Sequence, residues 1–231
     1  MASNNIQMIK IIAEGLGNLI DQVVFIGGSV TELYSTNPEH SEDIRMTEDV
    51  DIVVQIKSIS DFNNLEVSLR AKGFKNDLSP EAPICRWIYN GVKLDLMPDD
   101  SKILGFTNNW YTSGIINKVK FNIDDTTSIY IFDVIHYLAS KFEAIKSRGL
   151  IDLRLSHDFE DVIFIFLNCQ TLESSFIGSS IELKLFISTF LESISTRSDF
   201  KESISCALPY GLDTEVNPTI LKMETLIDLK P

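Results

Sequence analysis

The sequence predicts a mixed α/β (α+β) fold, in which a mixed sheet is flanked by helices and followed by a C-terminal helical region. Three observations predict it. A short apolar run at residues 23–26 ends at Gly-Gly-Ser, where a strand turns into a helix. Two later segments, residues 49–54 and 92–98, alternate apolar and polar residues as half-buried strands do. From residue 132 onward the apolar period becomes helical.

The composition is that of an ordinary globular protein. Of the 231 residues, 44% are hydrophobic and 23% are charged, which suits one sizeable domain or a catalytic domain with a helical extension. No apolar run approaches the length of a membrane span, and the first residues lack a signal-peptide core. The three cysteines lie far apart, which argues against a zinc site or a disulfide framework. We therefore expect a cytoplasmic protein with no membrane partner.

The net charge of −13 opposes one class of function. Proteins that grip long nucleic-acid duplexes normally carry a basic surface. Residues 101–155 hold seven basic and five acidic side chains, so this segment has a local excess of +2 and the rest of the chain carries −15. We expect a small anionic substrate or a short RNA end, and no extended duplex.

The first elements surround a glycine turn. Residues 4–20 show the apolar spacing of an amphipathic helix that leads into the first strand. Gly27, Gly28 and Ser29 follow that strand, and a helical pattern begins at Val30. Such a turn directs backbone N–H groups and the positive end of a helix dipole to one spot, which suits a phosphate.

Asp49 and Asp51 belong to the second strand. Side chains alternate between the faces of a strand, so both acids emerge on one face while Val50 and Ile52 point to the core. Two adjacent carboxylates repel each other unless a cation bridges them. Carboxylate oxygens are the ligands that Mg²⁺ prefers, usually together with substrate phosphates. The pair is therefore a candidate site for Mg²⁺ or Mn²⁺.

A third acid fits the same site. The Asn-Gly dipeptide at residues 90–91 predicts a hairpin between strands at residues 86–89 and 92–98. Asp95 lies on the face of its strand opposite the apolar residues. If this strand neighbours that of the acid pair, three carboxylates converge on a metal pair, the layout of two-metal phosphoryl transfer.

The other elements follow from their apolar spacing. Residues 61–72 form a helix, and we assign the aromatic loop at residues 104–111 to the core in preference to a bound base. The loop at residues 35–46 is expected to be exposed. Two more strands are expected at residues 116–123 and 128–131, and helices are expected to begin near residues 132, 156, 179, 200 and 220.

The motifs resemble a known superfamily. The order Gly27-Gly28-Ser29, Asp49-x-Asp51, Asp95 is similar to the signature of the DNA-polymerase-beta-type nucleotidyltransferases. Later motifs resemble the bacterial abortive-infection nucleotidyltransferases of the AbiEii type, which include toxins of toxin–antitoxin pairs: Lys141-Phe142-Glu143-Ala144, Arg148-Gly149 and Ser156-His157-Asp158-Phe159-Glu160-Asp161. The similarity spans roughly residues 20–170, and the tail beyond it matches no pattern.

The resemblance implies a nucleotidyltransferase fold, with a catalytic domain of residues 1–128 and a helical domain of residues 129–231 that completes the active site. It also implies roles for individual residues. The nucleotide-binding residues would be Gly27, Gly28, Ser29, Lys141 and Asp158, with Lys141 against the triphosphate, and the catalytic metal ligands would be Asp49, Asp51 and Asp95.

The implied activity is Mg²⁺-dependent transfer of a nucleoside monophosphate from an NTP to a hydroxyl acceptor. The leading acceptors are a tRNA 3′ end or a partner protein, in a toxin–antitoxin or abortive-infection system with an antitoxin partner. One alternative is a small-molecule nucleotidyltransferase of the antibiotic-modifying type, because the acidic surface would attract cationic drugs. The other is a nucleotide-binding module with an idle site.

Overall fold

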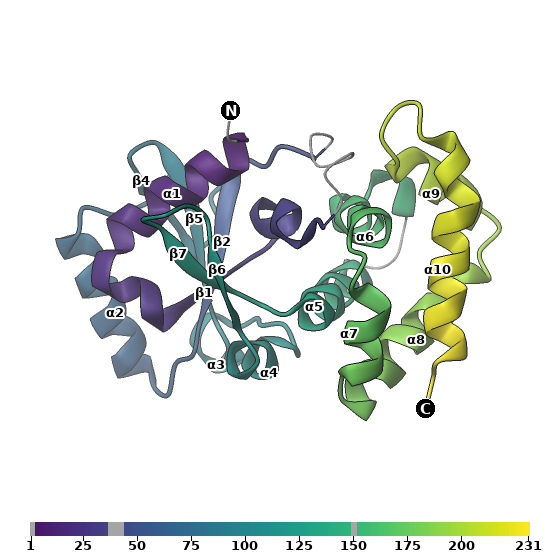
Figure 1. Cartoon of the computed structure of the whole chain (residues 1–231). Helices are drawn as coiled ribbons and strands as arrows, with labels where there is room; N and C mark the ends of the chain where they lie inside the picture. Colours follow the sequence, from purple (N-terminus) through teal and green to yellow (C-terminus); the bar gives the residue numbers. More distant parts are fainter. Residues whose placement is uncertain (1–2, 37–43, 149–151) are drawn as a thin grey trace. The chain divides into compact units, whose positions relative to one another are not determined.

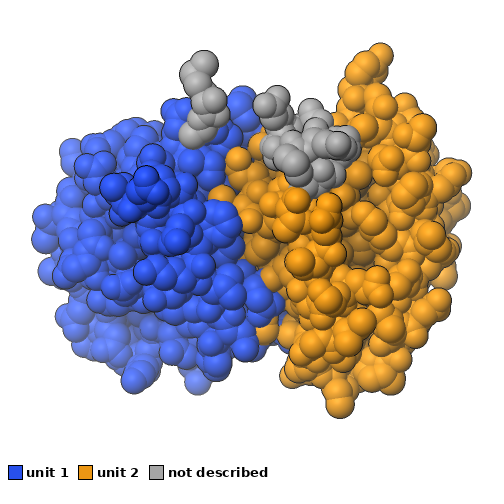
Figure 2. All heavy atoms as spheres, in the orientation of Figure 1, with its two compact units in different colours: residues 1–30, 46–133 blue, residues 31–45, 134–231 orange. Residues whose placement is uncertain are grey.

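The structure is a computed structural model that describes residues 3–36, 44–148 and 152–231. The chain divides into two compact units, which Figure 2 colours blue and orange. The first comprises residues 1–30 and 46–133, and the second comprises residues 31–45 and 134–231. Most of the loop predicted at residues 35–46, and Gly149 of the later motif, lie outside the described residues. The catalytic and helical domains drawn from the sequence remain a prediction.

The first unit is built on a mixed sheet, which confirms the predicted fold class. Its strands are β1 (Val23–Ile26), β2 (Asp49–Val54), β3 (Lys75–Asn76), β4 (Arg86–Tyr89), β5 (Val92–Pro98), β6 (Val119–Asn122) and β7 (Ser128–Ile131). Within the described residues their order across the sheet is β3-β4-β5-β2-β1-β7-β6. Figure 1 labels these strands, except β3. The pairs β2–β5 and β1–β7 are parallel, and the other neighbouring pairs are antiparallel.

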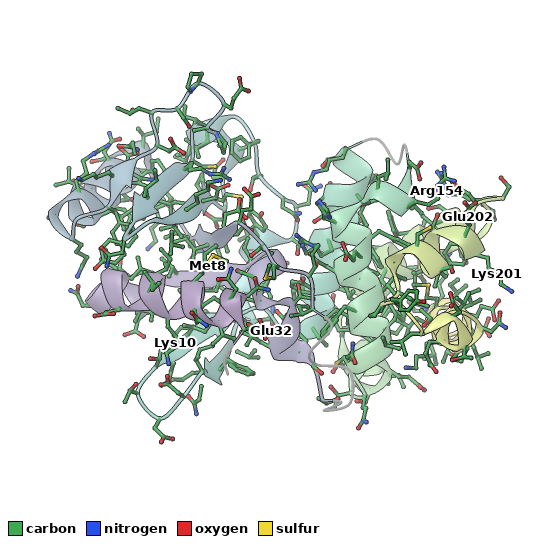
Figure 3. The ribbon with its side chains drawn as sticks, turned by 90° about the horizontal axis from the view of Figure 1, so that it is seen from above. Met8, Lys10, Glu32, Arg154, Lys201 and Glu202 are labelled. Carbon is green, nitrogen blue, oxygen red and sulfur yellow. The ribbon has the colours of Figure 1, made fainter. Side chains whose placement is uncertain are left out.

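Helix α1 (Asn4–Leu16) covers one face of this sheet. It begins at Ser3, whose hydroxyl accepts a hydrogen bond from the Ile6 N–H. Met8 and Lys10 lie on opposite sides of the helix (Figure 3), with Met8 buried. A Cβ at Gly15 would lie 2.6 Å from the ring of Tyr89 in β4, so glycine permits this close packing. Because Tyr89 shares the Val92–Leu94 face of the hairpin, α1 covers the apolar face opposite the acids.

The remaining helices of the first unit are α2 (Ile59–Ala71), α3 (Ser101–Leu104) and α4 (Tyr111–Ile116). The predicted helix at residues 61–72 is thereby confirmed, whereas α3 and α4 are too short to show an apolar period. The core assignment of the aromatic loop is confirmed for Trp110 and Tyr111, which are buried, and is wrong for Phe106, which is exposed. The Tyr111 hydroxyl donates to the Met97 sulfur at 3.4 Å, so α4 lies on the same face of β5 as Asp95.

The element after β1 differs from the prediction. It is a 3-10 helix, η2 (Gly28–Tyr34), and it begins two residues before the predicted start at Val30. Gly27 has a φ of +73°, which ends the strand, so the 3-10 helix begins at the next residue. A short 3-10 helix has fewer aligned peptide dipoles than an α-helix. Any phosphate site here therefore depends on the local N–H groups more than on a helix dipole.

The second unit consists of helices. They are α5 (Val134–Ser147), α6 (His157–Asn168), α7 (Leu172–Gly178), α8 (Ile181–Ser195), α9 (Phe200–Ala207) and α10 (Val216–Asp228), with short 3-10 turns η3 (Leu153–Leu155) and η4 (Asp213–Glu215). Phe142 of α5 stacks on Phe190 of α8 with 4.3 Å between ring centroids. Arg154 of η3 is 3.0 Å from Glu202 of α9 (Figure 3). Within the described residues, every helix is too short or too polar to span a bilayer.

Helix α6 is the buried centre of this unit. Ser156 caps it, because its hydroxyl accepts a hydrogen bond from the Phe159 N–H. Its apolar residues from Val162 to Leu167 are all buried. Lys222 of α10 donates to the Phe166 carbonyl at 2.8 Å, so the C-terminal helix is joined to α6 by a polar contact as well as by apolar packing.

Candidate active site

Three acids lie on one face of the sheet in the first unit. Strands β2 and β5 are parallel neighbours, and Asp51 is directly beside Asp95. Because side chains alternate along a strand, Asp49 emerges on the same face as Asp51. The two acid-bearing strands are therefore neighbours, which is the condition that a site of three carboxylates requires. The catalytic and metal-binding roles of the three acids stay predictions.

The glycine turn meets this row of acids at Gly27. Ile26 pairs with Asp51 across β1 and β2, so the residue after the strand lies over the acid. A Cβ built on Gly27 would lie 1.9 Å from the Asp51 Oδ2 atom. With its φ of +73°, the position requires glycine both for its backbone conformation and for the space that the carboxylate occupies. The turn and the acid pair, 24 positions apart in numbering between Gly27 and Asp51, thus form one site.

Ser29 is completely buried in the turn, with a relative exposure of 0%. Its hydroxyl oxygen has no hydrogen-bond partner in the part of the chain that the structure describes. A buried hydroxyl without a partner costs about 1–3 kcal/mol. Its O–H group is a donor of the kind that a phosphate oxygen accepts from.

Arg86 completes the row and was missed as a site residue from the sequence. Its Nε atom donates to Asp95 Oδ1 at 2.8 Å and its Nη2 atom donates to Asp95 Oδ2 at 2.8 Å. The same Nη2 atom donates to Asp49 Oδ2 at 2.6 Å. The hairpin holds the arginine in place, because β4 pairs with β5 so that Arg86 lies opposite Asp95.

The signal for Arg86 was present in the hairpin turn. Asn90 and Gly91 have φ values of 46° and 82°, as a two-residue primed turn requires. A turn of that length fixes the pairing of the two strands by counting outward, and Arg86 falls opposite Asp95. The pairing of an arginine with an acid on the same face could therefore have been predicted.

The electrostatics of the row follow from this contact. Burial raises the pKa of Asp49, the charge of Asp95 raises it further, and Arg86 acts in the opposite direction. The hydrogen bond to Asp95 raises the pKa of Arg86, so its guanidinium is a permanent cation. Arg86 therefore offsets the repulsion between two of the three acids, Asp49 and Asp95.

The carboxylates of this face are the candidate ligands for a divalent metal ion. Across residues 3–36, 44–148 and 152–231, no three His, Cys, Asp or Glu side chains are grouped so that they would hold a metal ion. The arginine takes both oxygens of Asp95. Asp49, whose Oδ2 atom accepts from Arg86, and Asp51 lie on one face of β2 and are carboxylates of the kind that Mg²⁺ prefers. The donors therefore fit one hard cation on β2.

Lys141 and Asp158 belong to the second unit, where they contact each other. Lys141 is only 6% exposed. Its Nζ atom lies 2.6 Å from Asp161 Oδ2 and 3.1 Å from Asp158 Oδ1. Burial by itself would lower the pKa of Lys141, but the charges of Asp161 and Asp158 raise it well above its ordinary value. Any phosphate that approached Lys141 would have to compete with two carboxylates.

Two arginines extend this buried cluster. Arg148 forms an ion pair with Asp158. Arg45, which precedes the acid strand in sequence, lies 3.3 Å from Asp161 and 3.6 Å from Glu160. The acids at the start of α6 therefore form ion pairs with basic side chains of their own unit. The proposed nucleotide contacts of Lys141 and Asp158 stay predictions.

Comparisons with known proteins bear on the fold. No protein-family model matches the sequence, and no curated protein sequence does. Among solved structures, the crystal structure of an antigenic nucleotidyltransferase-like protein from Paracoccidioides brasiliensis is similar, with a TM-score of 0.53 and 17% sequence identity. The similarity covers 89% of this chain and 94% of that protein. The chain therefore has a nucleotidyltransferase-like fold.

Proposed function

We propose that this protein is a Mg²⁺- or Mn²⁺-dependent nucleotidyltransferase that transfers a nucleoside monophosphate from an NTP to a hydroxyl acceptor. The observation that carries the proposal is the contact of Gly27 with Asp51. It joins a glycine turn, with its backbone N–H groups, to a pair of acids on an adjacent strand. The similarity to a nucleotidyltransferase-like structure supports the same reading at the level of the fold.

The residues of the site have separate proposed roles in binding phosphate and in binding the metal ion. Gly28 and Ser29 hold the β- and γ-phosphates with backbone N–H groups and the buried serine hydroxyl. Asp49 and Asp51 would hold the divalent ion, which would neutralise charge on the phosphates and the leaving pyrophosphate. Asp95 positions Arg86, which in turn donates to Asp49. Lys141 would contact the triphosphate, as the sequence resemblance implies.

The acceptor is proposed from the same resemblance. It is a tRNA 3′ end or a hydroxyl of a partner protein, in a toxin of the AbiEii type that is paired with an antitoxin. The net charge of −13 favours a different acceptor, a cationic small molecule of the aminoglycoside class, because an acidic surface concentrates cations. The two readings share the NTP site and differ only in the acceptor.

The test is transfer of label from NTPs that carry it on the α-phosphate. The protein is incubated with Mg²⁺, each of the four NTPs in turn, and either total cellular RNA, cell protein or a mixture of aminoglycosides. Label in RNA or in protein supports the toxin reading and names the nucleotide, whereas label on the drug selects the small-molecule enzyme. The matched control is Asp51→Asn, which removes one carboxylate charge and keeps the shape of the side chain.

The absence of both label transfer and pyrophosphate release would contradict the proposal. If no acceptor takes label in excess of the Asp51→Asn control, and no pyrophosphate is released, the protein is not a transferase under these conditions and the idle nucleotide-binding module becomes the better reading. Circular dichroism of the variant must match the wild type, because a loss of fold would make the comparison meaningless.

A further inference from the structure

The guanidinium of Arg86 occupies the space between two of the three acids. It donates to Asp49 from one side and to both oxygens of Asp95 from the other, at 2.6 and 2.8 Å. Its side chain is only 17% exposed, and that of Asp95 is 12% exposed. The contact is therefore a fixed, largely enclosed part of the site and not a mobile surface ion pair.

A divalent ion that used these acids would need the same space. Mg²⁺ binds carboxylate oxygens at about 2.0–2.1 Å, whereas the arginine nitrogens already lie within hydrogen-bond distance of Asp49 Oδ2 and of both Asp95 oxygens. Two cations cannot share those oxygens without strong mutual repulsion. An ion bridged by Asp49 and Asp95 would first have to displace Arg86 from its partner across the hairpin.

The register makes that displacement difficult. Arg86 is directly opposite Asp95 in an antiparallel pair that a two-residue turn fixes, so the side chain cannot leave by a shift of its strand. Its planar fork matches a carboxylate with two parallel hydrogen bonds. Unlike a metal ion, this cation is covalently part of the chain and stays charged at any pH at which the protein is folded.

We infer that Arg86 takes the place of a second metal ion, so that the site binds one divalent cation, on Asp49 and Asp51, instead of two. Asp95 is then a positioning residue that holds Arg86. This inference rests on the proposed function, because it assumes that the acids of β2 hold a metal ion together with an NTP. It narrows the two-metal arrangement expected from the sequence to one ion and one arginine.

The experiment counts ions per nucleotide on the full chain. Equilibrium dialysis is carried out with Mn²⁺ and a mixture of the four NTPs in which a methylene group replaces the α,β-bridging oxygen, so that no transfer occurs. Protein-retained Mn²⁺ and protein-retained nucleotide are measured separately. The double variant Asp49→Asn, Asp51→Asn gives the background of ions bound elsewhere on this acidic chain. We expect one Mn²⁺ per nucleotide for the wild type and two for Arg86→Gln.

A second variant covers the case in which Arg86→Gln fails to fold. Asp95→Asn keeps an oxygen that accepts from Arg86, and we expect it to retain one Mn²⁺ per nucleotide with the half-saturating Mn²⁺ concentration changed less than threefold. In a two-metal site the same substitution would remove one ion or raise that concentration at least tenfold.

The outcomes separate the inference from the proposed function. Two Mn²⁺ per nucleotide in the wild type, or one in both the wild type and Arg86→Gln, overturns the role of Arg86 and leaves the nucleotide site standing. No nucleotide retained in excess of the double variant overturns the proposed function, and the inference with it. One ion in the wild type and two in Arg86→Gln support both. Where Arg86→Gln does not fold, one ion in the wild type together with the expected Asp95→Asn result supports both.

Discussion

Gly27 and Asp51 approach each other so closely that a Cβ on Gly27 would lie 1.9 Å from a carboxylate oxygen of Asp51. This contact brings the end of β1 against the acid-bearing face of β2. It explains why the residue that follows the strand is glycine, beyond the φ of +73° that the turn requires. The contact also predicts how a single methyl group would disturb the site.

Gly27→Ala is expected to destabilise the protein more than Gly91→Ala. Both glycines have positive φ, 73° and 82°, and each alanine should cost about 1–2 kcal/mol for its backbone conformation. Only Gly27 has an atom in the way of the new methyl, whereas nothing lies within 4 Å of the corresponding position at Gly91. The clash should add about 1–3 kcal/mol. Urea unfolding of the two variants measures the difference, and equal losses would show that the carboxylate simply moves aside.

Lys141→Met is expected to cost about 3 kcal/mol in the free energy of unfolding, the lower end of the range for a broken buried ion pair. Asp158 and Asp161 lose the cation that they share and keep only their arginine partners. Lys201→Met is the control. Lys201 is exposed on α9 and points away from the helices (Figure 3), so its loss should change stability by no more than about 0.5 kcal/mol.

The same substitution distinguishes a structural lysine from a nucleotide contact. Partial rescue of stability in Lys141→Met by a second change, Asp161→Asn, would identify the ion pair as the reason for the loss. If Lys141→Met unfolds like the wild type and only nucleotide binding weakens, the buried pairing contributes little and the phosphate role stands alone.

Asn5→Ala is expected to loosen the approach to the acid strand. The buried Asn5 Oδ1 accepts hydrogen bonds from the Thr47 N–H at 3.0 Å and from its hydroxyl at 3.3 Å. Thr47 in turn donates to the Asp49 carbonyl at 3.0 Å. Loss of the acceptor leaves a buried N–H unpaired, at a cost of about 1–3 kcal/mol. Hydrogen exchange at Thr47 should become faster, while Asn63→Ala on the exposed face of α2 should leave it unchanged.

Cys206 should react with thiol reagents before the two buried cysteines, Cys85 and Cys169. Burial raises the pKa of Cys85 to about 12, and the charge of Asp95 adds to this effect. At pH 8 only about one thiol in 10,000 would then be ionised. Cys206 is exposed and should be alkylated first in the native protein. Mass spectrometry after a short treatment with iodoacetamide measures the order, and all three thiols should react in urea. Fast modification of Cys85 in the native state would mean that the hairpin beside Arg86 opens readily.

The sequence by itself determined the longer helices and strands and the face of β2 on which its two acids lie. Alternation along β2 placed Asp49 and Asp51 on one face, and the Asn-Gly turn defined the hairpin of β4 and β5, because both depend on local backbone geometry. Helix α6 was recognisable from its apolar surface and its Ser156 cap for the same reason. Short elements such as α3, α4 and β3 were missed, since fewer than two turns or three residues show no period.

Tertiary structure decided what each charged side chain touches. The adjacency of β2 and β5 brings Asp51 beside Asp95, and strand order depends on packing between segments that are distant in sequence. Arg86 reaches Asp49 only because the hairpin joins the sheet next to β2. Lys141 is shared between Asp158 and Asp161 because α5 packs on α6. Periodicity fixes the face of a residue, whereas the partner across that face is fixed by long-range burial of apolar surface.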